Sequence, residues 1–157
     1  MGHGIHARLV ASLALLLALT ASFHAAKLFR QDLLFTGVET ELGFWGHEDY
    51  HPRPATIQRT EQQLKRLLER APADSQYQAL QANYAAWRGY WAEDLEQRQQ
   101  FNRQAVLAQY GALKSRPAHR HSWAKMLQYT SRVQDGKPMR ATAQARLQAL
   151  QPAAGVD

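Results

Sequence analysis

The sequence predicts an all-α protein: an N-terminal transmembrane helix followed by a small helical-hairpin domain. Two observations support this prediction. Leu9 to Ala26 form an apolar stretch without a fixed charge, and the apolar residues that follow recur every three or four positions. No alternating apolar and polar run is long enough for a strand. At 157 residues, 45% of them apolar, the chain can form one modest domain with a packed core.

The N-terminal apolar stretch is long enough to cross a bilayer. As a helix it would rise about 27 Å, close to the hydrocarbon thickness of about 30 Å. A signal peptide needs small residues one and three positions before the cut, but cuts at the end of this stretch place Phe23 or His24 at the outer position. The helical pattern also continues to Phe35. We therefore predict an uncleaved anchor helix over residues 1–35, with a cleaved signal peptide or a buried soluble helix as alternatives.

The short segment before the apolar stretch indicates the orientation. Arg8 precedes the stretch and Lys27 and Arg30 follow it, so the distribution of positive charge does not decide the topology. A short N-terminal segment most simply stays in the cytoplasm, so the chain after the apolar stretch is translocated across the membrane. The prediction is a single-pass protein of the bacterial inner membrane with its soluble domain in the periplasm.

Proline, glycine and capping residues divide the remainder. Residues 36–55 contain three Gly and two Pro, which break the helical pattern, and they are predicted to form a juxtamembrane aromatic loop. Residues 56–152 are predicted to form the helical domain and residues 153–157 a tail. The expected helices run from Thr56 to Arg70, from Asp74 or Ser75 to Trp91, through Phe101 to Leu113, from about Ser122 to Val133, and from about Met139 to Leu150. Trp87, Trp91 and Trp123 lie on their apolar faces and are predicted core residues.

The segment ALKSRP, which ends at Pro117, resembles the close of a tetratricopeptide repeat, where Ala-Leu-x-x-x-Pro ends the second helix. Trp123 follows six residues later, where such a repeat places its first aromatic residue, and Pro152 lies 35 residues after Pro117, near the 34-residue period. The chain departs from the pattern because no Gly follows Met126 and Thr130 replaces an aromatic residue. The alternative is an ordinary bundle whose prolines simply follow helices.

The chain also resembles the VpsP-type proteins of bacterial exopolysaccharide gene clusters. The resemblance lies in ETELGFW, Glu39 to Trp45, soon after the apolar stretch, and in LKSRPAHRHSWAKM, Leu113 to Met126. It implies a membrane-anchored, helical accessory protein. The predicted function is therefore a scaffold of an envelope assembly, in polysaccharide biosynthesis or export, that acts by protein–protein binding and is not an enzyme.

Positive charge is concentrated in the C-terminal third. Residues 36–102 contain 7 Lys and Arg against 10 Asp and Glu, whereas residues 103–146 contain 9 Lys and Arg and the single acid Asp135. This asymmetry indicates an acidic protein, an anionic polysaccharide or lipid headgroups as partners; a solvated helix face is the alternative. The predicted partner-binding surface combines cations with an open apolar face of the last helix: Arg116, Arg120, Lys125, Arg132, Lys137, Arg140 and Arg146 with Met139, Leu147 and Leu150.

Few residues form a pattern that is typical of a metal site or a catalytic site. His47 and His51 are four residues apart with two carboxylates between them, so a small metal-binding protein or metal-dependent enzyme is the alternative function. They lie among Gly and Pro, and no third ligand is evident. The sequence contains no Cys, no phosphate-binding glycine loop and no nucleophile motif, so no catalytic residue and no cofactor is predicted. The anchor argues against a nucleic-acid partner.

Overall fold

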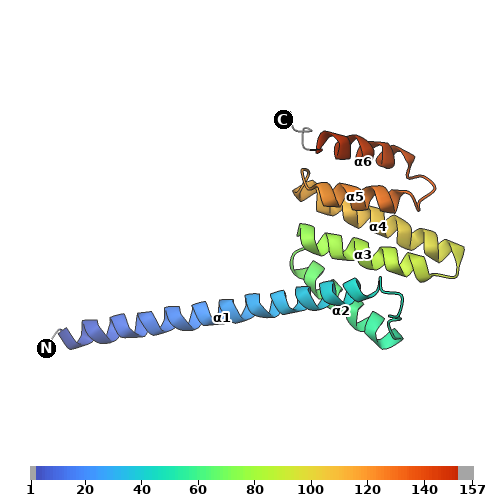
Figure 1. Cartoon of the computed structure of the whole chain (residues 1–157). Helices are drawn as coiled ribbons and strands as arrows, with labels where there is room; N and C mark the ends of the chain where they lie inside the picture. Colours follow the sequence, from blue (N-terminus) through green and yellow to red (C-terminus); the bar gives the residue numbers. More distant parts are fainter. Residues whose placement is uncertain (1–2, 152–157) are drawn as a thin grey trace, which may run out of the picture.

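The computed structural model describes the backbone of residues 3–151 and the side chains of residues 13–151, and within this range the protein is entirely α-helical (Figure 1). The prediction of an all-α fold is confirmed. The predicted tail, residues 153–157, lies outside the described residues. The helices are α1 (His3–Phe44), α2 (Pro54–Arg70), α3 (Ser75–Trp91), α4 (Leu95–Ser115), α5 (Arg120–Thr130) and α6 (Lys137–Ala149).

Helix α1 is continuous from the apolar stretch into the folded domain. The predicted loop over residues 36–55 is therefore wrong for its first nine residues, because α1 ends only at Phe44. A glycine inside a helix costs about 1 kcal/mol, and Gly37 and Gly43 made this segment look like a loop. Burial of Val38 and Leu42 against α2 and α3 outweighs that cost, since a fully buried aliphatic side chain contributes about 1.5–3 kcal/mol.

Two aspartates begin the central helices. Asp74 caps α3, as the sequence predicts, by accepting hydrogen bonds from the backbone N–H groups of Gln76 and Tyr77 at 2.8 and 3.1 Å. Asp94 caps α4 in the same way. The predicted cap at Thr56 is wrong: α2 begins at Pro54, whose missing N–H and fixed φ suit the first turn of a helix.

Helices α1 and α3 run in the same direction. The Gln31 side chain of α1 donates a hydrogen bond to the Tyr77 hydroxyl at the start of α3. Beyond the other end of this interface, the Trp45 ring lies 5.0 Å from the Trp91 ring at the end of α3. The folded domain therefore begins near Gln31, within the predicted anchor, and the segment before it projects from the stack of helices (Figure 1).

The connections between helices lie at two opposite ends of the stack. We call the end from which α1 projects the proximal end, and the other the distal end. The turns before α3 and after α4 share the proximal end, where the Ser115 hydroxyl donates to the Ala73 carbonyl oxygen at 3.3 Å. The connections after α3 and α5 share the distal end, where the Asn102 amide donates to the Arg132 carbonyl oxygen at 3.3 Å. Figure 1 shows this alternation along the stack.

Three apolar clusters form the core. The first joins α1, α2 and α3 around Leu42 and Leu64, and the second joins α3 and α4 through alanines, which let these two helices pack closely. The third joins α4, α5 and α6 around Met126. Trp123 belongs to it and is 7% exposed, as predicted, whereas Trp87 and Trp91 are only partly buried at the edge of the first cluster.

A hydrogen bond joins two residues of the repeat-like segment, Pro117 and Trp123. The Trp123 indole N–H donates a hydrogen bond to the Pro117 carbonyl oxygen at 2.8 Å. This contact links the end of the turn to the first inward-facing residue of α5. It gives the six-residue spacing a structural reason, although assignment to the tetratricopeptide family stays a prediction.

The apolar face of the last helix is not open. Met139, Leu147 and Leu150 are partly buried against the third cluster, and Ala143 between them is fully buried. The predicted apolar docking face of α6 is therefore wrong. The helix folds back on α5, and its exposed face consists of Ala, Thr, Gln and Arg side chains, so α6 itself is the polar cap of the stack.

Burial of Tyr129 predicts a loss of stability in alkali. Burial raises the pKa of its phenol from 10.0 to about 12. Because the folded state holds the proton more tightly, the contribution to stability is complete below pH 10 and is lost as pH rises through 12. A difference of two pKa units between the folded and unfolded states corresponds to a loss of about 2–3 kcal/mol in the free energy of unfolding.

We expect the Tyr129→Phe variant to lose less stability than the wild type between pH 10 and pH 12. Urea unfolding at a series of pH values measures this, and the ionisation of lysines is common to both proteins. Parallel losses in the two proteins across this range would contradict the assignment.

Candidate partner-binding groove

A groove lies between α1, α3 and α5. Its volume is about 520 Å³. Phe35, Glu39 and Gly43 of α1 line one wall, and the start of α5 lines the other. Ala79 and Asn83 of α3 lie between these walls. Side chains of these helices and of the α4–α5 turn line the groove together.

The charges in the groove are mainly positive. Arg116 and Lys125 line it together with His119 and His121, and Glu39 is the one carboxylate there. Among the described side chains, residues 13–151, the single ion pair within 4.0 Å joins Lys65 and Glu69, which are far along the chain from these cations. Within the described part of the domain, Arg116 and Lys125 therefore form no ion pair within 4.0 Å.

Buried hydrogen bonds position the α5 wall. The Gln109 amide of α4 is buried and donates to the Ser122 carbonyl oxygen at 2.9 Å. The His119 Nδ1 atom lies 2.8 Å from the Ser122 hydroxyl oxygen, and the His121 ring packs edge-on at 6.2 Å from the His119 ring. These contacts hold the first turn of α5 in place, so the basic side chains project from a rigid support.

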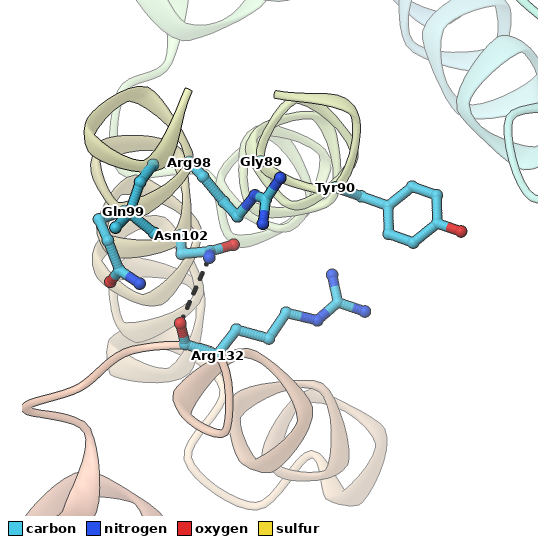
Figure 2. A pocket seen from close by; sticks show the side chains of 7 residues that line it. Gly89, Tyr90, Arg98, Gln99, Asn102 and Arg132 are labelled. Atoms are coloured by element: carbon cyan, nitrogen blue, oxygen red, sulfur yellow. Dashed lines mark hydrogen bonds between the residues drawn. The ribbon is translucent and has the colours of Figure 1, made fainter. Parts of the chain in front are cut away.

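A second hollow, of about 530 Å³, lies at the distal end between α3, α4 and α5 (Figure 2). Its polar groups stabilise the fold: Arg98 donates to the Ala92 carbonyl oxygen at 3.1 and 2.7 Å and so closes the end of α3, and Asn102 holds the end of α5. Asn102 also packs against Gly89, where a Cβ atom would lie 2.7 Å from its amide oxygen. This hollow is a structural junction, and it is a weaker candidate for a binding site.

The structure separates the predicted cations into different places. Arg116 and Lys125 line the groove, and Arg120 is exposed on the first turn of α5 beside it. Arg132 lines the distal hollow instead. Lys137 and Arg146 are exposed on α6, while Arg140 is partly buried and donates to the Thr130 carbonyl oxygen at 2.9 Å. The predicted single basic face is thus wrong, since these residues do not share one surface.

The two histidines of the alternative function are exposed in the connection after α1. His47 lies in a turn and His51 in irregular backbone, so they do not share a helix face. Within the described residues, no group of three or more His, Cys, Asp or Glu side chains lies close enough to hold a metal ion. No observation in this region favours the metal-dependent alternative.

Sequence reasoning missed the contribution of α1 and α3 to the groove. Glu39, Gln76 and Asn83 carry no motif, and their meeting with Lys125 depends on the stacking of helices that are far apart in sequence. The polar positions on α3 between its apolar residues were the only signal. Comparisons of the chain with protein-family models, curated proteins and solved structures found no match.

Proposed function

We propose that this protein is a membrane-anchored helical scaffold of a bacterial envelope assembly, and that its groove binds an acidic segment of a partner membrane protein. The supporting observation is the pair of cations, Arg116 and Lys125, in a preformed groove without neutralising ion pairs. A carboxylate-bearing segment would complement these charges and the amide side chains of α3.

The anchor is the second part of the proposal. Helix α1 is long and apolar enough to cross a membrane, judged by length and composition. Leucines at positions 13, 15, 16, 17 and 19 and Phe23 are 58–68% exposed, so no part of the domain covers them. A row of uncovered leucines is unfavourable in water and favourable in a bilayer. We propose in addition that the helical domain lies in the periplasm.

The resemblance to VpsP-type proteins supports polysaccharide biosynthesis or export as the pathway. Deletion of the gene in its own host should then reduce secreted polysaccharide, and the chain without its anchor should not restore it. Unchanged polysaccharide after deletion would direct attention to another envelope assembly, without affecting the role of the groove.

Site-specific photo-crosslinking tests the groove. A photoreactive residue at Ala79, inside the groove, should form adducts with a membrane protein in intact cells. The same residue at Leu107, which is 69% exposed on α4, is the matched control and should not form them. The crosslinked peptide of the partner should be acidic. Equal adducts from both positions would overturn the groove as the binding site.

Charge reversal tests the electrostatic part. Lys125→Glu places a carboxylate opposite the acidic partner segment, and the repulsion should lower the yield of adduct by about fivefold or more. Lys137→Glu is the control, because Lys137 is exposed at the distal end, away from the groove. The adduct yield from purified membranes should also fall as salt rises, since the cations are accessible to solvent. A Lys125→Glu variant with wild-type adduct yield would contradict the proposal.

A further inference from the structure

The two ends of the helix stack differ in charge. The proximal end carries Lys114, Arg116 and Arg120 with His119 and His121, all within eight residues that contain no acid; we call these five residues the basic edge. Of the acids near this end, Asp74 caps α3, Glu69 lies 3.9 Å from Lys65, and Asp32 is exposed on α1. The distal connections carry the acids Glu48, Asp49, Glu93, Asp94 and Asp135 together with the cations Arg53 and Arg132.

The basic edge lies level with a particular part of α1. Ser115 contacts Ala73 before α3, and α3 begins beside Gln31, which donates to Tyr77. The groove residue Phe35 is the next contact of α1 along this side, with its ring 5.9 Å from that of Tyr77. The basic edge is therefore level with residues 31–35 of α1.

The same part of α1 exposes apolar side chains. Leu28, Phe29 and Leu33 are 64%, 63% and 56% exposed. The described domain leaves these apolar side chains uncovered, so lipid would have to shield them from water. Lys27 and Arg30, next to these residues in the sequence, can extend their charged ends toward the headgroups while their aliphatic parts remain in the apolar layer. This level of α1 therefore matches the boundary between hydrocarbon and headgroups.

We propose that the basic edge rests on the anionic phospholipid headgroups of the membrane that α1 crosses. The inference depends on the anchor of the proposed function. Because α1 continues into the domain without a break, the helix presents the proximal end to the bilayer, and the stacking brings the cations of a distant segment to the same level. Each cation near an anionic surface strengthens binding about fivefold. The domain is then held in one orientation, with the distal end facing away from the membrane.

Fluorescence quenching of the full chain in lipid nanodiscs tests this orientation. The chain contains no Cys, so one cysteine can be placed at Ala118 in the basic turn or, as the control, at Gln134 in the distal turn; both positions are exposed. A fluorophore at each cysteine is quenched by lipids that carry a nitroxide on the headgroup. We expect quenching at position 118 to be at least threefold stronger than at 134 in nanodiscs that contain phosphatidylglycerol, and to weaken in phosphatidylcholine alone.

Removal of cations from the basic edge distinguishes binding to anionic headgroups from mere nearness of the turn to the bilayer. Lys114→Gln with Arg120→Gln should abolish the dependence on phosphatidylglycerol, whereas Arg53→Gln with Lys137→Gln, two exposed distal cations, should preserve it. A chain that inserts into nanodiscs but shows equal quenching at both positions, or no lipid dependence, would overturn the headgroup contact and leave the anchor intact. A chain that does not enter nanodiscs and is released from membranes by alkaline carbonate would overturn both.

Discussion

Trp123→Ala should be the most damaging of the single substitutions considered for this domain. The Trp123 ring is 7% exposed among Leu113, Met126 and Ala143, and its N–H is hydrogen-bonded to Pro117. Removal of a buried tryptophan leaves a cavity and costs about 3–5 kcal/mol. Small domains have about 5–15 kcal/mol in total, so α5 and α6 should lose much of their packing.

Denaturant unfolding of the full chain in mild detergent, followed by circular dichroism, measures this loss. Trp123→Phe is the informative control, because it keeps an aromatic ring at this site and removes the smaller pyrrole part with its N–H. It should cost about 1–2 kcal/mol. Leu107→Ala, at an exposed site on α4, should cost almost nothing. An unchanged midpoint for Trp123→Ala would contradict the description of the third cluster.

A chain that begins at Gly46 should fail to fold, whereas a chain that begins at Lys27 should fold and remain soluble. The difference lies in the second half of α1 and the residue that follows it, where Val38, Leu42 and Trp45 are 0%, 1% and 2% exposed. Three buried apolar side chains at about 1.5–3 kcal/mol each amount to about 5–9 kcal/mol, which is comparable with the whole stability of a small domain.

Thermal melts of the two truncated chains, recorded side by side, check this prediction. The chain from Lys27 should give a cooperative transition. The chain from Gly46 should aggregate or give none, because Leu64, Leu67 and Tyr84 lose their partners on α1. If both chains melt at the same temperature, the distal half of α1 is not part of the core.

Local signals in the sequence predicted most of the helices. Asp74 indicates the start of α3, and Pro72 and Pro117 indicate the turns before α3 and α5. The apolar spacing of three and four residues indicates the buried faces of the helices. These signals act within one or two turns of helix, so they do not depend on neighbouring elements. The prediction failed between Gly37 and Phe44, because the contribution of packing there exceeds the local preference of glycine to leave a helix.

The candidate groove could be predicted only in part. The basic segment from Arg116 to Lys125 is evident as a run of charge, but nothing local indicates that it faces α1 and α3. The exposed face of α6 was misjudged for the same reason. An apolar stripe such as that of Met139 and Leu147 shows that a helix is covered on one side, without showing whether the cover comes from its own chain or from a partner.

By itself, the sequence determined the all-α class, the apolar N-terminal stretch and the concentration of positive charge in the C-terminal third, because each depends on composition and short-range spacing. Only the tertiary structure decided that α1 continues into the core, that α6 closes the stack, and that Lys125 and Glu39 line the same groove. These outcomes depend on contacts between residues distant in sequence, where the burial of one helix against another outweighs the preferences of either segment alone.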